Sequence, residues 1–172
     1  FNDGMARVEL DGKWGFVDNT GKEIVACKYD GAYAFNDGMA IVELDGKYGF
    51  INATGNEVIP CKYDSAESFS EGLAAVKLDG KYSFIDKTGA EVIPCKYDSA
   101  RSFSEGLAAV GFDGKFGFID NAGKEVIPCK YEIVDGFSKG MAQVKLDGKY
   151  GFIDKTGNEI ISCKYDRIYR AD

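Results

Sequence analysis

The sequence predicts an all-β fold built as a tandem array of β-hairpin repeats, and three observations carry this prediction. Phenylalanine recurs every 34 residues from Phe1 to Phe137, and cysteine recurs with the same spacing from Cys27 to Cys163. An Asp-Gly dipeptide stands at the same place in every unit, and no segment has sustained helical periodicity. The period divides the chain into five units, residues 1–34, 35–68, 69–102, 103–136 and 137–170, and leaves 171–172 as a C-terminal remainder.

Each unit begins with a β-hairpin. In the third unit, residues 73–78 and 82–86 are expected to form two strands on either side of Asp79-Gly80. Asp-Gly suits the two-residue type I′ turn because both central residues of that turn need a positive φ. The turn fixes the register and sets Val76 opposite Ser83, a position that is Gly or Ser in every unit. We therefore expect something to pack closely on that face, such as the neighbouring repeat.

A second turn and a third strand follow the hairpin. Residues 86–89 have Asp and Gly at the first and fourth positions of a type I turn, and a strand is expected over 91–95. Pro94 interrupts this strand, as Pro60 and Pro128 do in two other units, which indicates an edge or a bend because proline donates no backbone hydrogen bond. The linker over 99–103 has room for a short fourth strand.

Two architectures fit these elements. An open, solenoid-like stack of hairpins is favoured, because 34 residues is short for a four-stranded propeller blade. A closed, five-bladed, propeller-like ring is the alternative, because a whole number of repeats is what a ring closed by both termini would contain.

The composition of the chain limits the classes of partner that we expect. The net charge of −7 and the interspersed lysines argue against nucleic acid, which requires a basic face. No apolar run approaches the roughly 20 residues of a membrane-spanning helix, so no membrane insertion is expected.

The five cysteines stand at one equivalent position, and histidine is absent. Disulfides and zinc are therefore disfavoured, and each thiol is expected to be a small buried apolar group. Unpaired thiols favour the cytoplasm. The chain starts at Phe1 instead of methionine, so a cell-surface or secreted location with a removed leader stays open.

The unit resembles the bacterial WG repeat, also called the KWG repeat. The resemblance rests on Lys13-Trp14-Gly15-Phe16, followed by Asp18, Gly21 and Glu23, and it recurs in register over the whole chain. Only the first unit keeps the tryptophan; Tyr48, Tyr82, Phe116 and Tyr150 replace it, and Ser83 replaces the glycine. The resemblance implies a bacterial repeat protein with an interaction-related function, and it supplies no catalytic residue.

The residues themselves also predict no catalytic, cofactor or metal site. A catalytic site needs a constellation placed once, whereas almost every polar residue here is copied in each unit. The paired acids Asp11 and Asp18 invite comparison with metal ligands or a glycosidase pair, but both start turns, where Asp bonds the backbone.

Repeated aromatic residues are the stronger candidates for binding. Four positions per unit supply 20 of the 23 aromatic residues, and stacking in the core is favoured over a carbohydrate-binding face. If any of these rings are exposed, we expect the tyrosines of the Cys-Lys-Tyr sequences, because a phenol tolerates one wet edge: Tyr29, Tyr63, Tyr97, Tyr131 and Tyr165.

Positions that differ between units are the remaining candidates. They gather in the inter-repeat linker and at the third residue of the first strand, where stacking does not need them. In repeat arrays such residues often form the ligand face, and the alternative is that they are solvated and unconstrained. The candidates are Arg7, Ile41, Tyr33, Glu67, Arg101 and Tyr169.

Repetition without a singular polar cluster leads to one functional hypothesis and one alternative. The hypothesis is a non-enzymatic scaffold that presents an extended surface to a protein or polymer ligand. The alternative is a structural spacer or fibre element of a longer array, with end-to-end continuation into further repeats.

Overall fold

The computed structural model describes residues 4–169, which form β-strands and turns with no helix. Consequently, no helix in this part of the chain is long and apolar enough to cross a membrane. The strands form five antiparallel sheets. The first sheet contains β1 (Met5–Leu10), β2 (Lys13–Asp18) and β3 (Glu23–Tyr29). The second contains β4 (Gly31–Asn36), β5 (Met39–Leu44), β6 (Lys47–Asn52) and β7 (Glu57–Tyr63).

The remaining sheets repeat this plan. The third contains β8 (Ser65–Ala66), β9 (Leu73–Leu78), β10 (Lys81–Asp86) and β11 (Glu91–Tyr97). The fourth contains β12 (Ser99–Ala100), β13 (Leu107–Phe112), β14 (Lys115–Asp120) and β15 (Glu125–Tyr131). The fifth contains β16 (Ile133–Val134), β17 (Met141–Leu146), β18 (Lys149–Asp154) and β19 (Glu159–Tyr165).

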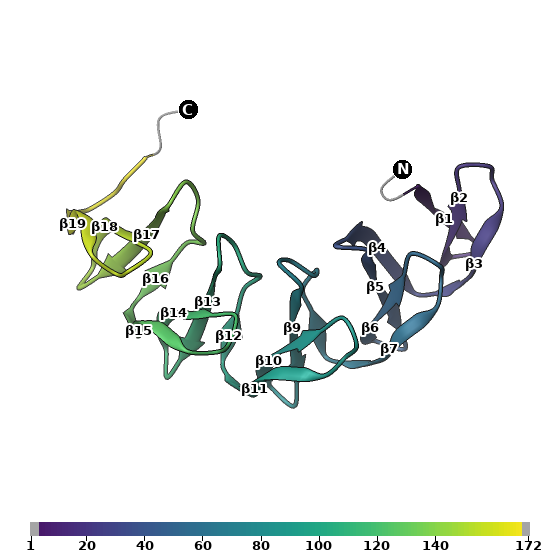
Figure 1. Ribbon diagram of the computed structural model, residues 1–172, viewed down its shortest axis with the longest axis horizontal. Helices are drawn as coiled ribbons and strands as arrows, with labels where there is room; N and C mark the ends of the chain where they lie inside the picture. Colours follow the sequence, from purple (N-terminus) through teal and green to yellow (C-terminus); the bar gives the residue numbers. More distant parts are fainter. Residues whose placement is uncertain (1–3, 170–172) are drawn as a thin grey trace.

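The sheets follow one another along an open arc (Figure 1). The first and last sheets lie at opposite ends of this arc, so the described residues form the open array that the sequence favours and not the closed ring. The third strands, β3, β7, β11, β15 and β19, lie along the outer side of the arc (Figure 1). Strand order within a sheet is sequential, so the short linker strands lie at the opposite, inner edge.

The predicted hairpin register is confirmed. Val76 pairs with Ser83, Leu78 with Lys81 and Ala74 with Ile85. Asp79 and Gly80 both have positive φ, 49° and 83°, as a type I′ turn requires. A second turn of this kind, at Glu71-Gly72 in the third sheet, leads into β9 and has φ values of 55° and 84°.

The small residue opposite the valine makes room for the third strand of its own sheet. A Cβ placed on Gly117 would lie 2.4 Å from the carbonyl oxygen of Ile127 and 2.7 Å from the backbone nitrogen of Cys129. The expectation that a neighbouring repeat causes this constraint is therefore wrong. The cause is a bulge in the third strand, where Phe116 pairs with Tyr131 but Phe118 pairs with Ile127.

The third strand is an edge strand, as the prolines indicate, and the predicted fourth strand is also present. The linker of one unit supplies the first strand of the next sheet. Ser99 and Ala100 pair with Gly111 and Val110. The boundary between sheets thus lies four residues before the phenylalanine that begins each unit, at Gly31 instead of Phe35.

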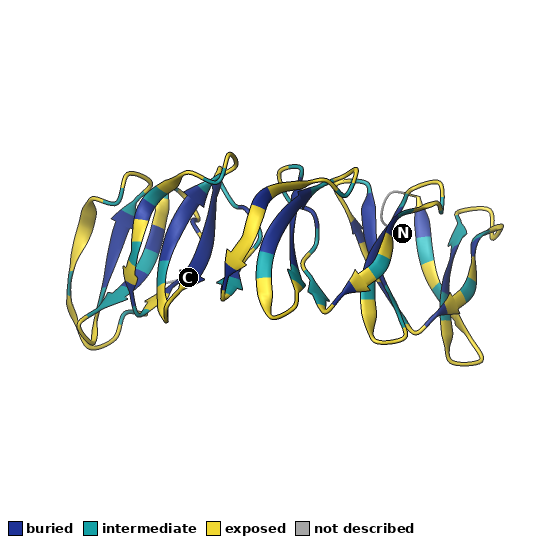
Figure 2. Ribbon diagram, turned by 90° about the horizontal axis from the view of Figure 1, so that it is seen from below, coloured by how far each residue is buried: buried dark blue, intermediate teal, exposed yellow. Residues whose placement is uncertain are grey.

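The hydrophobic core lies between sheets. Four clusters of buried side chains each join one sheet to the next, and buried strands face each other along the arc (Figure 2). Within a cluster, a phenylalanine of one sheet contacts a phenylalanine of the next. The ring centroids of Phe84 and Phe103 lie 5.1 Å apart, and the ring planes cross at 63°. Such edge-to-face pairs add to the free energy of area burial. Because each interior sheet is covered on both faces, its strands have apolar residues on both faces.

Candidate functional site

Several of the candidate binding residues are buried in the core and are therefore not available at the surface. Tyr29, Tyr63, Tyr97 and Tyr131 are at most 5% exposed, so the expectation that they are the exposed aromatic residues is wrong for all four. Each ring enters the interface with the following sheet. The Tyr29 hydroxyl donates a 3.2 Å hydrogen bond to Glu57 of the next sheet, and burial raises the pKa of this phenol. Tyr165, in the last sheet, is 44% exposed because no described residue covers its face.

The variable position on the first strand also belongs to the core. Ile41 is buried in the interface between the second and third sheets, and Ala75 and Ala109 occupy the same place in later interfaces. The idea that stacking does not need this position is therefore wrong. In the two terminal sheets this position is not buried: Gln143 is half-buried, and Arg7 is exposed, donates a 3.0 Å hydrogen bond to the Ala32 carbonyl and lies over the Trp14 ring.

Linker residues form the exposed part of the candidate set. Tyr33, Glu67 and Arg101 follow the same core residue in successive sheets, and all three are exposed. The Glu67 and Arg101 amides donate hydrogen bonds to the Ala75 and Ala109 carbonyls, 2.8 and 3.0 Å long, so the backbone of this row is fixed on the sheets. Tyr169 occupies the equivalent position after the fifth sheet and is 79% exposed. We call Tyr33, Glu67 and Arg101 the linker row.

A groove lies beside this row, between the second and third sheets. It has a volume of about 270 Å³ and brings together three of the candidates, Tyr33, Ile41 and Glu67. The Tyr33 and Tyr48 rings lie 6.5 Å apart at its wall. The hydroxyl of Tyr48 is partly desolvated and lies near Glu43, so its pKa is raised. The groove therefore offers a phenol donor, two aromatic faces and a carboxylate. We call it the Tyr33 groove.

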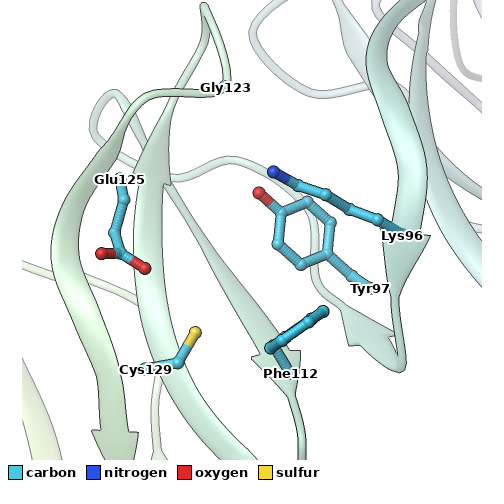
Figure 3. Close-up of a pocket in the computed structure, with 6 residues that line it drawn as sticks. All are labelled: Lys96, Tyr97, Phe112, Gly123, Glu125 and Cys129. Atoms are coloured by element: carbon cyan, nitrogen blue, oxygen red, sulfur yellow. The ribbon is translucent and has the colours of Figure 1, made fainter.

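A second groove lies on the outer side of the arc, where the third sheet meets the fourth (Figure 3). It has a volume of about 280 Å³ and is lined by Lys96, Tyr97, Phe112, Gly123, Glu125 and Cys129. The Lys96 ammonium lies 5.0 Å from the centre of the Tyr97 ring. Burial raises the pKa of the Cys129 thiol, which therefore stays protonated and weakly nucleophilic at neutral pH. All these residues except Phe112 recur in the other units, so this groove is a repeated product of stacking.

Acidic side chains of the repeat are used in backbone and lysine contacts. Asp98 accepts a hydrogen bond from Lys81 of its own sheet and a 3.0 Å bond from the Asp113 amide in the next turn. The Lys81 bond is the main cause that holds the pKa of Asp98 below its ordinary value. Asp18 accepts hydrogen bonds from the Thr20 hydroxyl and the Thr20 and Lys22 amides, as its place in a turn predicts. Among residues 4–169, no three metal-ligating side chains form a cluster.

Sequence reasoning missed Tyr48 as a groove residue, because it follows Asp-Gly-Lys and was counted with the repeated core aromatics. Its side chain is only half-buried. The neighbouring ring could have indicated the groove, because Tyr33 is the only aromatic residue at its linker position in the first four units. The cysteines also depart from expectation, since four are half-buried and Cys95 is exposed instead of all being buried.

Comparisons with known proteins agree with this geometry. A family model described as a WG containing repeat matches residues 1–14, 14–48, 48–82, 82–116, 116–150 and 150–171. No curated protein sequence matches the chain.

Solved structures share the arrangement at low sequence identity. Hsv2 of Kluyveromyces lactis is similar over 93% of this chain and 61% of its own, with a TM-score of 0.58 and 10% identity. A eukaryotic initiation factor is similar over 92% of this chain and 52% of its own, with a TM-score of 0.58 and 14% identity. PorZ, a surface component of the type-IX secretion system of Porphyromonas gingivalis, is similar over 94% of this chain and 25% of its own, with a TM-score of 0.50 and 11% identity. The chain thus spans less than two thirds of each of these proteins, and at such identities the likeness concerns the fold alone.

Proposed function

Because the chain belongs to the WG repeat family and its repeats form an open β scaffold, we propose that it is a non-enzymatic binding protein whose linker row holds an extended segment of another protein. The observation that carries the proposal is the contrast between two sets of residues. Those that repeat are used in turns and between sheets, whereas the linker residues that differ, Tyr33, Glu67 and Arg101, stand exposed at one equivalent position of successive sheets.

The chemistry of the row favours a polypeptide over a repetitive polymer. A polymer of identical units would meet an equivalent side chain at every repeat, but successive sheets present an aromatic ring, an acid and a base. Tyrosine and arginine are also among the side chains enriched in residues that dominate binding energy in protein interfaces. The Tyr33 groove, at one end of the row, has the rings and the carboxylate to hold one side chain of such a segment.

A displayed library of random peptides, selected on the immobilised chain, tests this function. We expect selected peptides to lose at least about tenfold in affinity for the Tyr33→Ser/Arg101→Ser variant, since two anchor residues are removed. The matched control is Val92→Ser/Lys87→Ser, which changes the net charge equally. Its Val92 is as exposed as Tyr33, 42%, but lies on outer strand β11. Equal affinity for both variants contradicts the proposed site. Binding to arrayed polysaccharides through the same residues, with no peptide selected, contradicts the choice of a protein ligand.

A further inference from the structure

The aromatic ring that follows Asp-Gly-Lys carries a cation of the chain in three of the five sheets. In the third and fifth sheets this cation is the lysine directly opposite the ring on the neighbouring strand. A cation over the face of a tyrosine or tryptophan is attracted by the ring quadrupole, so this position of the repeat can hold a positive charge. The pairs are Arg7 over Trp14, Lys77 over Tyr82 and Lys145 over Tyr150, with 5.8, 5.5 and 5.3 Å from the charged group to the ring centre.

Tyr48 occupies this position in the second sheet, where the chain supplies no such cation. Glu43 lies opposite its ring, at the place where the third and fifth sheets have lysine. Ile41 stands at the place where the first sheet has Arg7. Tyr48 is half-buried and lines the Tyr33 groove, so part of its ring is accessible to a cation from outside the chain.

The interface between the first and second sheets shows how an arginine occupies this place. The Arg7 guanidinium lies over Trp14 and donates a 3.0 Å hydrogen bond to the Ala32 carbonyl of the following sheet. In the next interface the residue equivalent to Ala32 is Ala66, which lines the groove. Both alanines pair with the equivalent valine of their sheets, so their carbonyls have the same orientation. The ring and the backbone acceptor that hold Arg7 therefore both recur in the groove.

Two carboxylates make the Tyr33 groove acidic. Glu67 lines it from the third sheet, and Glu43 lies near the Tyr48 hydroxyl. A Cβ placed on Gly31 would lie 3.0 Å from Glu43 Oε2 and 3.8 Å from Tyr33 Cε2, so this carboxylate extends beside the Tyr33 ring. Within residues 4–169 no lysine or arginine forms an ion pair with either glutamate. A cation that enters the groove therefore meets two carboxylates that no basic side chain neutralises.

This combination distinguishes the second sheet from the others in the described part of the chain. In the first, third and fifth sheets a cation of the chain already lies over the ring. In the fourth sheet Phe116 lies opposite Gly111, which offers no carboxylate, and Arg101 takes the place of Tyr33. A second cation would be repelled there, so the Tyr33 groove is the favoured place for one.

We propose that the Tyr33 groove holds an arginine side chain of the bound segment. Its guanidinium lies over Tyr48, donates to the Ala66 carbonyl and is neutralised by Glu43 and Glu67. The inference rests on the proposed function, because the segment supplies the arginine. Arginine suits the place better than lysine, since a planar guanidinium stacks on a ring while its N–H groups donate to acceptors at its edge, whereas an ammonium is a compact, strongly hydrated point charge.

NMR titration of the isotope-labelled 172-residue chain with the blocked tripeptide acetyl-Gly-Arg-Gly-amide tests the site. The amide signals of Tyr33, Tyr48 and Glu67 should shift. The same peptide with citrulline, which has the shape of arginine without its charge, should bind at least about fivefold more weakly. The peptide with lysine should bind at least about threefold more weakly. The proposal is overturned if the arginine peptide causes no shift, or if the citrulline or lysine peptide binds as tightly.

A variant that supplies the cation from the chain gives an independent check. Glu43→Lys sets a lysine over Tyr48, as Lys77 lies over Tyr82. The third and fifth sheets already have lysine at this position, so the variant should fold like the wild type. It should bind the arginine peptide at least about tenfold more weakly, because it removes a carboxylate and covers the ring. Glu91→Lys, at an exposed residue of β11, changes the net charge equally and should bind like the wild type. The same affinity in both variants overturns the proposal.

Peptides selected on the immobilised chain distinguish a failure of the arginine site from a failure of the binding function. Selected peptides that require Tyr33 and Arg101, share no arginine and bind Glu43→Lys like the wild type would overturn the arginine site and leave the binding function intact. An arginine tripeptide that binds in the groove and is lost in Glu43→Lys, while no longer peptide is selected, would support the cation site and contradict the binding function.

Discussion

The Tyr29 hydroxyl reaches across the interface between the first two sheets and donates a hydrogen bond to Glu57, at 3.2 Å. The bond joins the last residue of β3 to the first residue of β7. Removing the hydroxyl in Tyr29→Phe should lower the free energy of unfolding by about 0.5–1.5 kcal/mol, the usual net contribution of such a bond. Urea unfolding measures this change. Tyr33→Phe, at an exposed ring outside the core, serves as control, and an equal loss in both variants would contradict the assigned role.

Tyr29 also makes the free energy of unfolding depend on pH in alkaline solution. Burial, then the neighbouring Glu57, raises the pKa of its phenol in the folded state, whereas the unfolded phenol ionises near pH 10. Above this pH the unfolded chain binds fewer protons than the folded chain, so the free energy of unfolding falls as the pH rises further. Tyr29→Phe should flatten this fall. Parallel pH profiles of wild type and variant, measured by urea unfolding between pH 8 and about pH 11, would show that Tyr29 is not responsible.

Turn glycines of the Asp-x-x-Gly sequence pack against the preceding sheet, and the first unit provides a control without such a sheet. Gly55 has φ +82°, and a Cβ there would lie 2.8 Å from Val25 Cγ2 and 2.9 Å from the Ile24 carbonyl oxygen. Gly21 has φ +85°, with no atom within 4 Å of its Cβ position. Gly21→Ala should therefore cost only the backbone strain of a left-handed conformation, about 1–2 kcal/mol. Gly55→Ala should cost about 1–3 kcal/mol more through overpacking. Equal melting temperatures would mean that the turn does not pack against the preceding sheet.

Ser83 explains why one cysteine differs from the others. Cys27, Cys61 and Cys129 direct their thiols to the carbonyls of Val8, Val42 and Val110, at 3.7–3.8 Å, across a glycine of the second strand. In the third sheet Ser83 has a Cβ at this place, and the Cys95 thiol lies instead near the Leu78 and Lys81 carbonyls and is exposed.

Exchanging serine and glycine at this position of the second strand should therefore change the reactivity of the neighbouring cysteine thiol. We expect Ser83→Gly to slow the reaction of Cys95 with a disulfide reagent several-fold, because the thiol returns to the Val76 carbonyl. Gly117→Ser should accelerate the reaction of Cys129 in the same manner. Peptide mapping after timed labelling assigns each rate. Unchanged rates in both variants would show that Ser83 does not cause the exposure of Cys95.

Strands and turns were predictable from the sequence because their determinants are local. Asp79-Gly80 requires a particular turn, that turn fixes the pairing of Val76 with Ser83, and Pro94 confines its strand to an edge. The direction in which each face packs was not predictable in this way. Both faces of an interior hairpin are apolar, so periodicity alone does not say which face meets the next unit.

The errors at the candidate site have the same origin. Ile41 is buried although its position varies between units, and variation at a buried position resembles variation at a free surface. Stacking in the core is the favoured interpretation of the repeated aromatics, and it holds for Tyr97; Tyr97 was a surface candidate only on the condition that some of these rings are exposed. The bulge between Tyr82 and Phe84 in the pairing of β10 with β11 leaves its ring on the buried face. Tyr33, Glu67 and Arg101 are exposed, as expected for the variable linker, and each directly follows the alanine that packs toward the core, Ala32, Ala66 or Ala100.

Small-angle X-ray scattering of the 172-residue chain, extrapolated to low concentration, tests most directly the central claim that the sheets pack face to face in an open arc. The arc has its ends apart (Figure 1), so we expect an asymmetric distribution of interatomic distances with a long tail. A narrow, symmetric distribution that ends near the width of a closed five-sheet ring would contradict it.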